Sequence, residues 1–428
     1  MGPKLNVALN RPINNEFYVS NERISGTVQL ELFRPSSIIS LSVSIRGTSQ
    51  TYVPMTNSDS LLLVTFGGRS IHTLVHQVQV VFPPENVRQA AKGSKKGFQV
   101  SPGSYSFDFE FLMPNWLKCM NDHGIKQAGF NRKEPYPRLP PSFNGDVTGA
   151  GLVDCENSFY KMGSVTYYIK ASLVSGKMGF RWTPGHSMVD AYQALDFMPT
   201  PSNDGEHPLG LQSSVGPPQK FVSKKSFELS SDCSAKIEIK SQSLSRVFRM
   251  DYMFQPGCQK FDKVSLKLDR RPTRPLNVKV LQLKLHLIEI VNYLSQAQVN
   301  AMVGAIALVE MQLNRVLDTS RIRSAADGSF EWPLNLGDIP ELARYRFNDS
   351  NILYCGNRLL SFTSCNIKRA FKFCLILKLE ANGTVFETEV LTTICDIGYF
   401  SIEDHEELPT YEISDVPPIY SNQDQVTA

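Results

Sequence analysis

The chain of 428 residues has no long hydrophobic segment, since no run approaches the roughly 18 apolar residues that span a bilayer. Residues 1–6 also lack the apolar core of a secretory signal. None of the eight cysteines belongs to a Cys-x-x-Cys pair, so neither a disulfide framework nor a zinc motif is evident. We therefore expect a cytoplasmic protein whose thiols are reduced.

Common catalytic motifs are missing as well: the chain has no Gly-x-Ser-x-Gly, no Gly-x-x-x-x-Gly-Lys and no His-Glu-x-x-His. His72 and His76 lie in an alternating segment typical of a strand. Their even spacing predicts that both occupy one strand face, with no carboxylate or cysteine joining them. We predict no catalytic residue, no cofactor and no metal site.

Period-two alternation of apolar and polar residues dominates what is present, and it is typical of strands with one buried face. It occurs at residues 24–32, 39–45, 105–111, 165–173, 281–287 and 371–379. Asn382-Gly383 predicts a hairpin turn. Helical signals are few, with short helices predicted at 85–92 and 295–303.

A stretch rich in proline and glycine separates the two groups of strands. The sequence therefore predicts an all-β protein of two antiparallel β-sandwich lobes in tandem, at residues 1–200 and 219–400. A linker at 201–218 joins them. Residues 401–428 form the tail.

The tail contains seven acidic residues and neither Lys nor Arg. Its apolar residues are too sparse to offset the entropy lost on ordering, so we expect disorder. It carries Pro417-Pro418-Ile419-Tyr420, in which the prolines favour a polyproline II turn. Such a segment docks in the aromatic groove of a WW domain, through Pro417, Pro418 and Tyr420. A weaker copy, with Leu408, Pro409 and Tyr411, precedes it.

Because the tail carries −7 and the whole chain +3, residues 1–400 carry +10. This spread-out charge argues against nucleic acid as a partner, and so against a β-sandwich transcription factor. Two basic loops could contact anionic lipid headgroups or acidic cargo, or be solvated surface: Lys92, Lys95 and Lys96 in one, and Arg270, Arg271 and Arg274 in the other.

Several N-terminal segments resemble the arrestin N-terminal domain. Residues 24–30 (ISGTVQL) are similar to its opening strand, 109–114 (FEFLMP) to a strand end, and 139–143 (LPPSF) with 165–171 to the closing passage. With the proline-rich motif, the chain resembles the α-arrestins, the arrestin-related trafficking adaptors. No arginine and acid pattern matches the polar core of visual arrestins, so phosphate-triggered activation is not implied.

The resemblance implies arrestin-type lobes and a role as adaptor for a WW-domain HECT-type ubiquitin ligase. Such adaptors bring the ligase to integral membrane transporters at the plasma membrane or endosomes, promoting ubiquitination, endocytosis and degradation. The adaptor itself is often ubiquitinated, and peripheral membrane contact is compatible with the role. The alternative is a ligase-independent arrestin-fold scaffold for sorting or signalling, retromer-like or in ambient-pH signalling.

Overall fold

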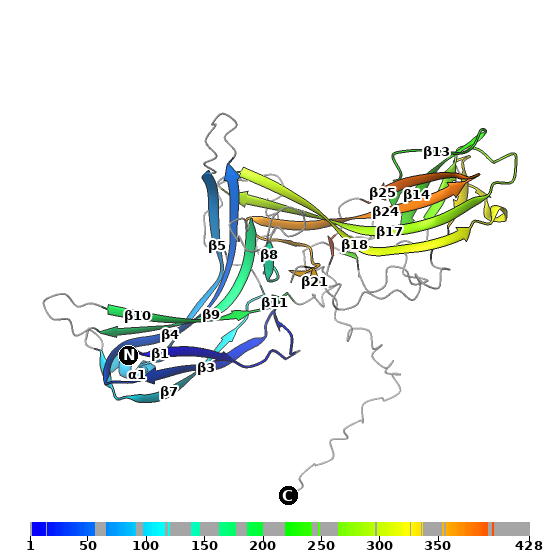
Figure 1. Ribbon diagram of the computed structural model, residues 1–428. Helices are drawn as coiled ribbons and strands as arrows, with labels where there is room; N and C mark the ends of the chain where they lie inside the picture. Colours follow the sequence, from blue (N-terminus) through cyan, green and yellow to red (C-terminus); the bar gives the residue numbers. More distant parts are fainter. Residues whose placement is uncertain are drawn as a thin grey trace, which may run out of the picture.

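The computed structural model describes residues 2–13, 15–55, 66–90, 97–115, 119, 138–145, 162–176, 186–199, 219–241, 247–248, 264–295, 298–325, 327–334, 336, 353–354, 357–392 and 396–397. Most of these residues lie in strands, which form two lobes side by side in an elongated molecule (Figure 1). The predicted linker 201–218 and tail 401–428 lie outside the described residues. Among those described, no helix reaches the length and apolarity that a membrane crossing requires.

The first lobe is a sandwich of two antiparallel sheets. One has the strand order β1-β3-β7, and the other has the order β10-β9-β4-β5, with β6 paired to β4 and β8 to β9. A short parallel ladder joins β2 to β11. The bounds are β1 Lys4–Leu9, β2 Tyr18–Val19, β3 Arg23–Leu32, β4 Ser36–Met55, β5 Phe66–Phe82, β6 Phe98–Val100, β7 Gly103–Leu112, β8 Phe143–Gly145, β9 Gly163–Gly176, β10 His186–Leu195 and β11 Phe197–Met198.

The second lobe repeats the two-sheet plan. Its sheets have the orders β12-β14-β16-β20-β19, with β13 on β14, and β18-β17-β24-β23, with β25 on β24. Two small ladders pair β15 with β26 and β21 with β22. The bounds are β12 Gln219–Val222, β13 Phe227–Ser230, β14 Cys233–Ser241, β15 Val247–Phe248, β16 Val264–Leu268, β17 Val278–Ser295, β18 Gln298–Val316, β19 Arg323–Ser324, β20 Phe330–Pro333, β21 Leu353–Tyr354, β22 Asn357–Arg358, β23 Phe362–Thr363, β24 Ile367–Ala381, β25 Thr384–Leu391 and β26 Asp396–Ile397.

The alternating patterns form strands because each pattern gives one apolar face to bury. In β3, Ile24, Val28 and Leu30 are buried, while Ser25, Thr27 and Gln29 on the other face are more exposed. The predicted turn at Asn382-Gly383 is confirmed: it closes the β24–β25 hairpin with both residues at positive φ, 50° and 81°. This is the backbone shape that Asn-Gly favours.

The two helix predictions have different outcomes. Helix α1 covers Glu85–Ala90, and an ion pair between Glu85 and Arg88 supports it. The helix predicted at 295–303 is wrong. Ser295 ends β17 and pairs with Gln298 at the start of β18, so this region is a long hairpin. Its valines, Val299 and Val303, have the branched side chains that strands accommodate better than helices do.

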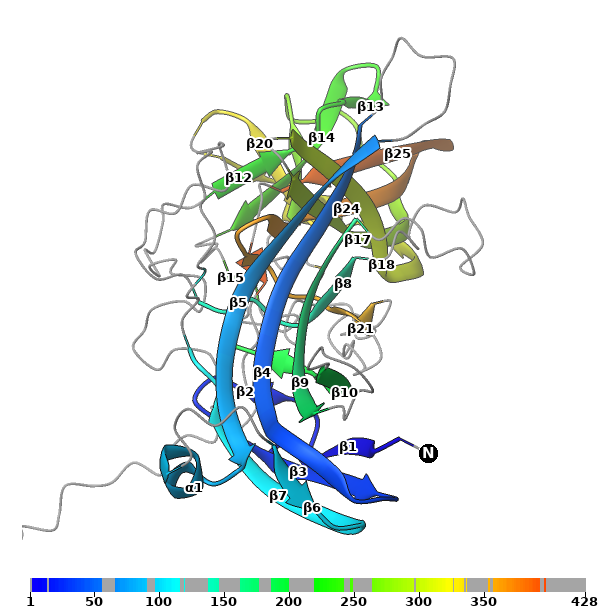
Figure 2. The same ribbon diagram turned by 90° about the vertical axis from the view of Figure 1, so that its left-hand side faces the viewer.

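The two lobes have separate hydrophobic cores, but β17 and β24 contribute to both. The second-lobe core includes Trp332, Phe371 and Phe373 and, among the described residues, draws only on the second half of the chain. The first-lobe core includes residues from that half as well: Val291, Tyr293, Phe362, Cys365 and Ile367. Figures 1 and 2 show why, since β17, β18 and β24 extend out of the second lobe toward β4 and β5. At about 3.3 Å per residue, the 18 residues of β17 span roughly 60 Å.

Candidate functional site

The predicted WW-binding residues and the first basic loop lie outside the described residues. The WW-binding residues are Pro417, Pro418 and Tyr420, with Leu408, Pro409 and Tyr411 in the weaker copy, and the loop residues are Lys92, Lys95 and Lys96. The structure therefore leaves their proposed roles as predictions. Among the predicted contact residues, it places the three arginines of the second basic loop.

The arginine loop, residues 269–277 between β16 and β17, is exposed at Arg270, Arg271 and Arg274. Thr273 anchors it by donating hydrogen bonds from its hydroxyl and backbone N–H to the Asp232 carboxylate. Ser230 donates to the other carboxylate oxygen over 2.7 Å. Hydrogen bonds from Thr273 and Ser230 lower the pKa of Asp232 to about 2. The loop is thus fixed at its middle while its guanidinium groups remain on the surface.

The two lobes meet at a buried contact that we call the lobe seam, where β4, β8 and β9 face β17 and residues 357–369. Its centre is a network of neutral polar groups around Asn366, which is fully buried. The Asn366 amide donates to Thr51 Oγ1 over 3.2 Å and to the Ser49 carbonyl over 3.3 Å. Thr51 Oγ1 in turn donates to the Leu294 carbonyl over 2.7 Å. Buried polar groups that are mutually satisfied specify one relative position of the lobes.

In a second seam contact, the side-chain amide of Asn357 pairs with the backbone of Asn144 as a neighbouring strand would. The Asn144 backbone N–H donates to Asn357 Oδ1 over 2.6 Å, and Asn357 Nδ2 donates to the Asn144 carbonyl over 2.5 Å. Next to it, the Phe143 and Phe362 rings pack edge to face with centroids 5.2 Å apart. These contacts join β8 of the first lobe to β22 and β23 of the second half through side chains.

The seam also buries one cation, Arg369, which is 2% exposed. Its Nε donates to Glu289 Oε1 over 2.6 Å, and its guanidinium lies over the Phe143 and Phe371 rings. Burial lowers the pKa of Arg369, while the Glu289 carboxylate acts in the opposite direction. Removing Glu289 would leave the buried Arg369 charge without its carboxylate partner, which is costly.

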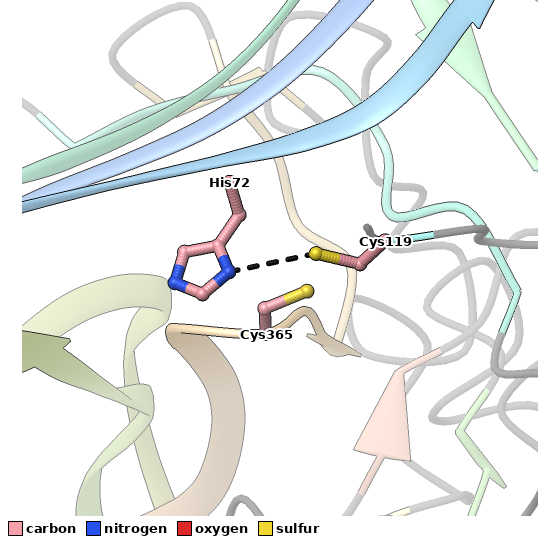
Figure 3. Close-up of side chains that lie close together, drawn as sticks. All are labelled: His72, Cys119 and Cys365. Atoms are coloured by element: carbon pink, nitrogen blue, oxygen red, sulfur yellow. Dashed lines mark hydrogen bonds between the residues drawn. The ribbon is translucent and has the colours of Figure 1, made fainter. Parts of the chain in front are cut away.

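His72 lies near two cysteines at the edge of the seam (Figure 3). His72 comes from β5, Cys119 follows β7, and Cys365 lies between β23 and β24. The His72 Nδ1 and Cys119 Sγ atoms are 3.6 Å apart, and one ligand atom from each of the three residues lies within 4.8 Å of the others. The Ser70 hydroxyl is 2.8 Å from His72 Nε2. Cys365 is buried, and the other two residues are half-buried.

Two sequence predictions about His72 are wrong. His76 does not share its face, because the β4–β5 pairing shifts between Thr73 and Val75 and leaves Leu74 as an extra residue. Leu74 and Val75 are both buried as a result, and His76 turns outward. Cysteines do join His72, but they come from distant parts of the chain. Sequence spacing carries no signal for such a grouping, or for the seam network, in which Asn366 contacts residues more than 300 positions away.

Comparisons with known proteins agree with this two-lobed architecture. The family model of the arrestin (or S-antigen) N-terminal domain matches residues 5–178. The model of the arrestin-related trafficking adapter 10 C-terminal domain matches residues 215–402. The second half, in whose sequence no arrestin-like segment was identified, thus fits a specific family domain.

Full-length relatives are also found. The chain is 33% identical to arrestin-related trafficking adapter 10 of Lachancea thermotolerans over 430 residues, covering 97% of this chain and 99% of the relative. It is 29% identical to the Saccharomyces cerevisiae protein of that name, with 98% of each covered. The Eremothecium gossypii protein of that name is 29% identical, with 91% and 93% covered. The chain therefore belongs to the arrestin-related trafficking adapters of the α-arrestin family, and its role is that of an adaptor in trafficking.

Proposed function

We propose that this adaptor brings a WW-domain HECT-type ubiquitin ligase to integral membrane transporters and so promotes their ubiquitination, endocytosis and degradation. The observation that carries the proposal is Pro417-Pro418-Ile419-Tyr420 in an acidic tail that follows the two arrestin lobes. Two proline rings and one tyrosine bury roughly 250 Å² of apolar area, worth about 6 kcal/mol before ordering costs. We therefore expect a dissociation constant of about 1 μM or weaker for a single WW domain.

The body would supply the cargo contact. The arginine loop supports this, because it presents three exposed guanidinium groups on an anchored backbone. Such groups suit an acidic cargo segment or anionic headgroups. A rigid seam would hold this surface at a constant position relative to the first lobe. By holding ligase and cargo together, the adaptor would raise the effective concentration of cargo lysines at the ligase. We place the adaptor in the cytoplasm, recruited to plasma membrane or endosomes, and expect ubiquitination of its own lysines.

The test uses the full chain and variants that leave the lobes untouched. Tyr420→Ala should remove most WW-domain binding in a titration, because the tyrosine pocket loses its occupant. Tyr411→Ala should weaken binding to tandem WW domains only modestly, and it serves as the matched control. In cells, Tyr420→Ala should abolish ligase co-purification and slow transporter turnover. Unchanged ligase binding would refute the proposal, and unchanged turnover despite lost ligase binding would favour a ligase-independent scaffold.

A further inference from the structure

We propose that His72, Cys119 and Cys365 form a zinc site that ties the two lobes together. Two thiolates and one imidazole are donors that Zn²⁺ prefers. At metal bonds of about 2.3 Å to sulfur and 2.0–2.1 Å to nitrogen, tetrahedral ligand atoms stand roughly 3.6–3.8 Å apart. The 3.6 Å between His72 Nδ1 and Cys119 Sγ already meets this spacing. The remaining pairs, within 4.8 Å, need about 1 Å of side-chain adjustment.

The surroundings of the cluster hold its ligands in place. The Ser70 hydroxyl lies 2.8 Å from His72 Nε2, so it can accept the Nε2–H in the tautomer whose Nδ1 lone pair coordinates a metal. Cys365 lies between Ser364 and Asn366, whose side chains belong to the seam network. Its backbone is therefore fixed by hydrogen bonds that do not involve the thiol. A ligand held by neighbouring contacts loses little entropy on binding metal.

Charge balance favours a divalent ion. Cys365 belongs to the first-lobe core, where an isolated thiolate would be costly. Two thiolates, a neutral imidazole and one Zn²⁺ sum to zero, so the occupied site can be buried. Three protein ligands leave a fourth position for water. Because Cys365 comes from the second half and the other ligands from the first, zinc binding stabilises the lobe seam.

The experiment uses the full-length protein, purified reduced and stripped of metal, then titrated with Zn²⁺ and with Co²⁺ as a spectroscopic substitute. We expect about one metal ion per chain, thiolate-to-cobalt charge-transfer absorption and a higher melting temperature with zinc. Cys119→Ser and His72→Gln should lose stoichiometric binding and the zinc-dependent shift. Cys233→Ser and Cys374→Ser, which alter buried thiols of the second lobe, are matched controls and should retain both.

Ser70→Ala should weaken zinc binding roughly 10–100-fold without removing the site, since the serine only orients the imidazole. Cys365→Ser alters a core position, so Cys119→Ser, at a half-buried position, decides the question, with circular dichroism to confirm its sheets. Retention of zinc by Cys119→Ser would overturn the proposal. So would metal binding that never saturates, or a mass spectrum showing a Cys119–Cys365 disulfide in protein that takes up no metal.

Discussion

At the scale of single residues, Asn366 is the centre of the lobe seam's hydrogen-bond network. Its amide donates to Thr51 Oγ1, and its carbonyl oxygen accepts from the Ser49 and Ser364 hydroxyls. Neutral groups can be buried here because each has a partner, whereas removing one member leaves the others unsatisfied. The seam therefore depends on side chains that look unremarkable in the sequence.

Replacing Asn366 by alanine should lower the free energy of unfolding by about 2–4 kcal/mol, because Ser49 and Thr51 lose buried partners. Urea unfolding of the full chain measures this loss. Asn277→Ala, at an exposed position, is the control and should change stability by less than about 0.5 kcal/mol. Equal effects of the two substitutions would contradict the central role of Asn366.

Asp232 governs the arginine loop. Since hydrogen bonds lower its pKa to about 2, its anchoring is present above the unfolded pKa of about 3.9 and is lost only as pH falls through the folded value. Protection of the loop should therefore be constant between about pH 4 and pH 8. Asp232→Asn should weaken the anchor throughout this range.

The rate of limited trypsin digestion at one peptide bond of the loop measures how well Asp232 anchors it. Arg271 and Arg274 precede prolines and resist trypsin, so cleavage reports on the Arg270–Arg271 bond. It should be several-fold faster in Asp232→Asn than in wild type. Glu228→Gln, at an exposed position of β13, should cleave like wild type. Identical rates in all three proteins would show that Asp232 does not hold the loop.

At the scale of elements, the seam requires a glycine where β9 meets β17. A Cβ at Gly163 would lie 2.6 Å from a Tyr293 ring carbon, closer than side chains pack. Gly163→Ala should therefore cost about 1–3 kcal/mol of unfolding free energy through overpacking. At the other end of β9, Gly176→Ala meets its nearest atom at 3.5 Å and should be nearly neutral.

A double-mutant cycle with Tyr293→Leu tests this cause. Removing the ring should relieve part of the Gly163→Ala cost, so the double variant should be less destabilised than the sum of the single variants. Additive effects, or equal losses at the two glycines, would contradict the contact.

The elements themselves were largely predictable, because a strand's alternation is a local property. The patterns at 24–32 and 371–379 became β3 and β24, and Asn382-Gly383 made its turn. The error at 295–303 arose because a short apolar run is compatible with helix or strand, and only pairing with β17 decides. The bulge at Leu74 has no signal in the sequence either, so His72 and His76 were wrongly predicted to share one strand face.

At the scale of the whole molecule, a few N-terminal segments together with the proline-rich motif of the tail indicated the family, and the comparisons confirm it. The seam and the His72 cluster were not predictable, because their residues meet only after both lobes have folded. The tail motif, by contrast, is a linear signal that needs no fold. It stays a prediction here.

The unequal contributions to the two cores predict unequal behaviour of the two halves. Residues 1–218 alone lack Val291, Tyr293, Phe362 and Ile367, each worth about 1.5–3 kcal/mol when buried. This loss of roughly 6–12 kcal/mol rivals the total stability of a domain. The fragment should bind a hydrophobic dye and lack a cooperative melting transition.

Residues 219–428 are the matched comparison, since every described residue of the second-lobe core lies within them. This fragment should show sheet by circular dichroism and a cooperative transition. A 1–218 fragment that melts cooperatively at the temperature of the full chain would contradict the prediction.

The passage of β17 through both cores also constrains how relatives can recombine. A chimera joined within residues 201–218 would place the side chains at 291 and 293 of one parent inside the interior of the other. Positions 291 and 293 must therefore match the first lobe, whose core they fill, although they belong to the second half of the chain. To exchange the first lobes of two such adaptors, the residues at 291 and 293 would have to be exchanged with them.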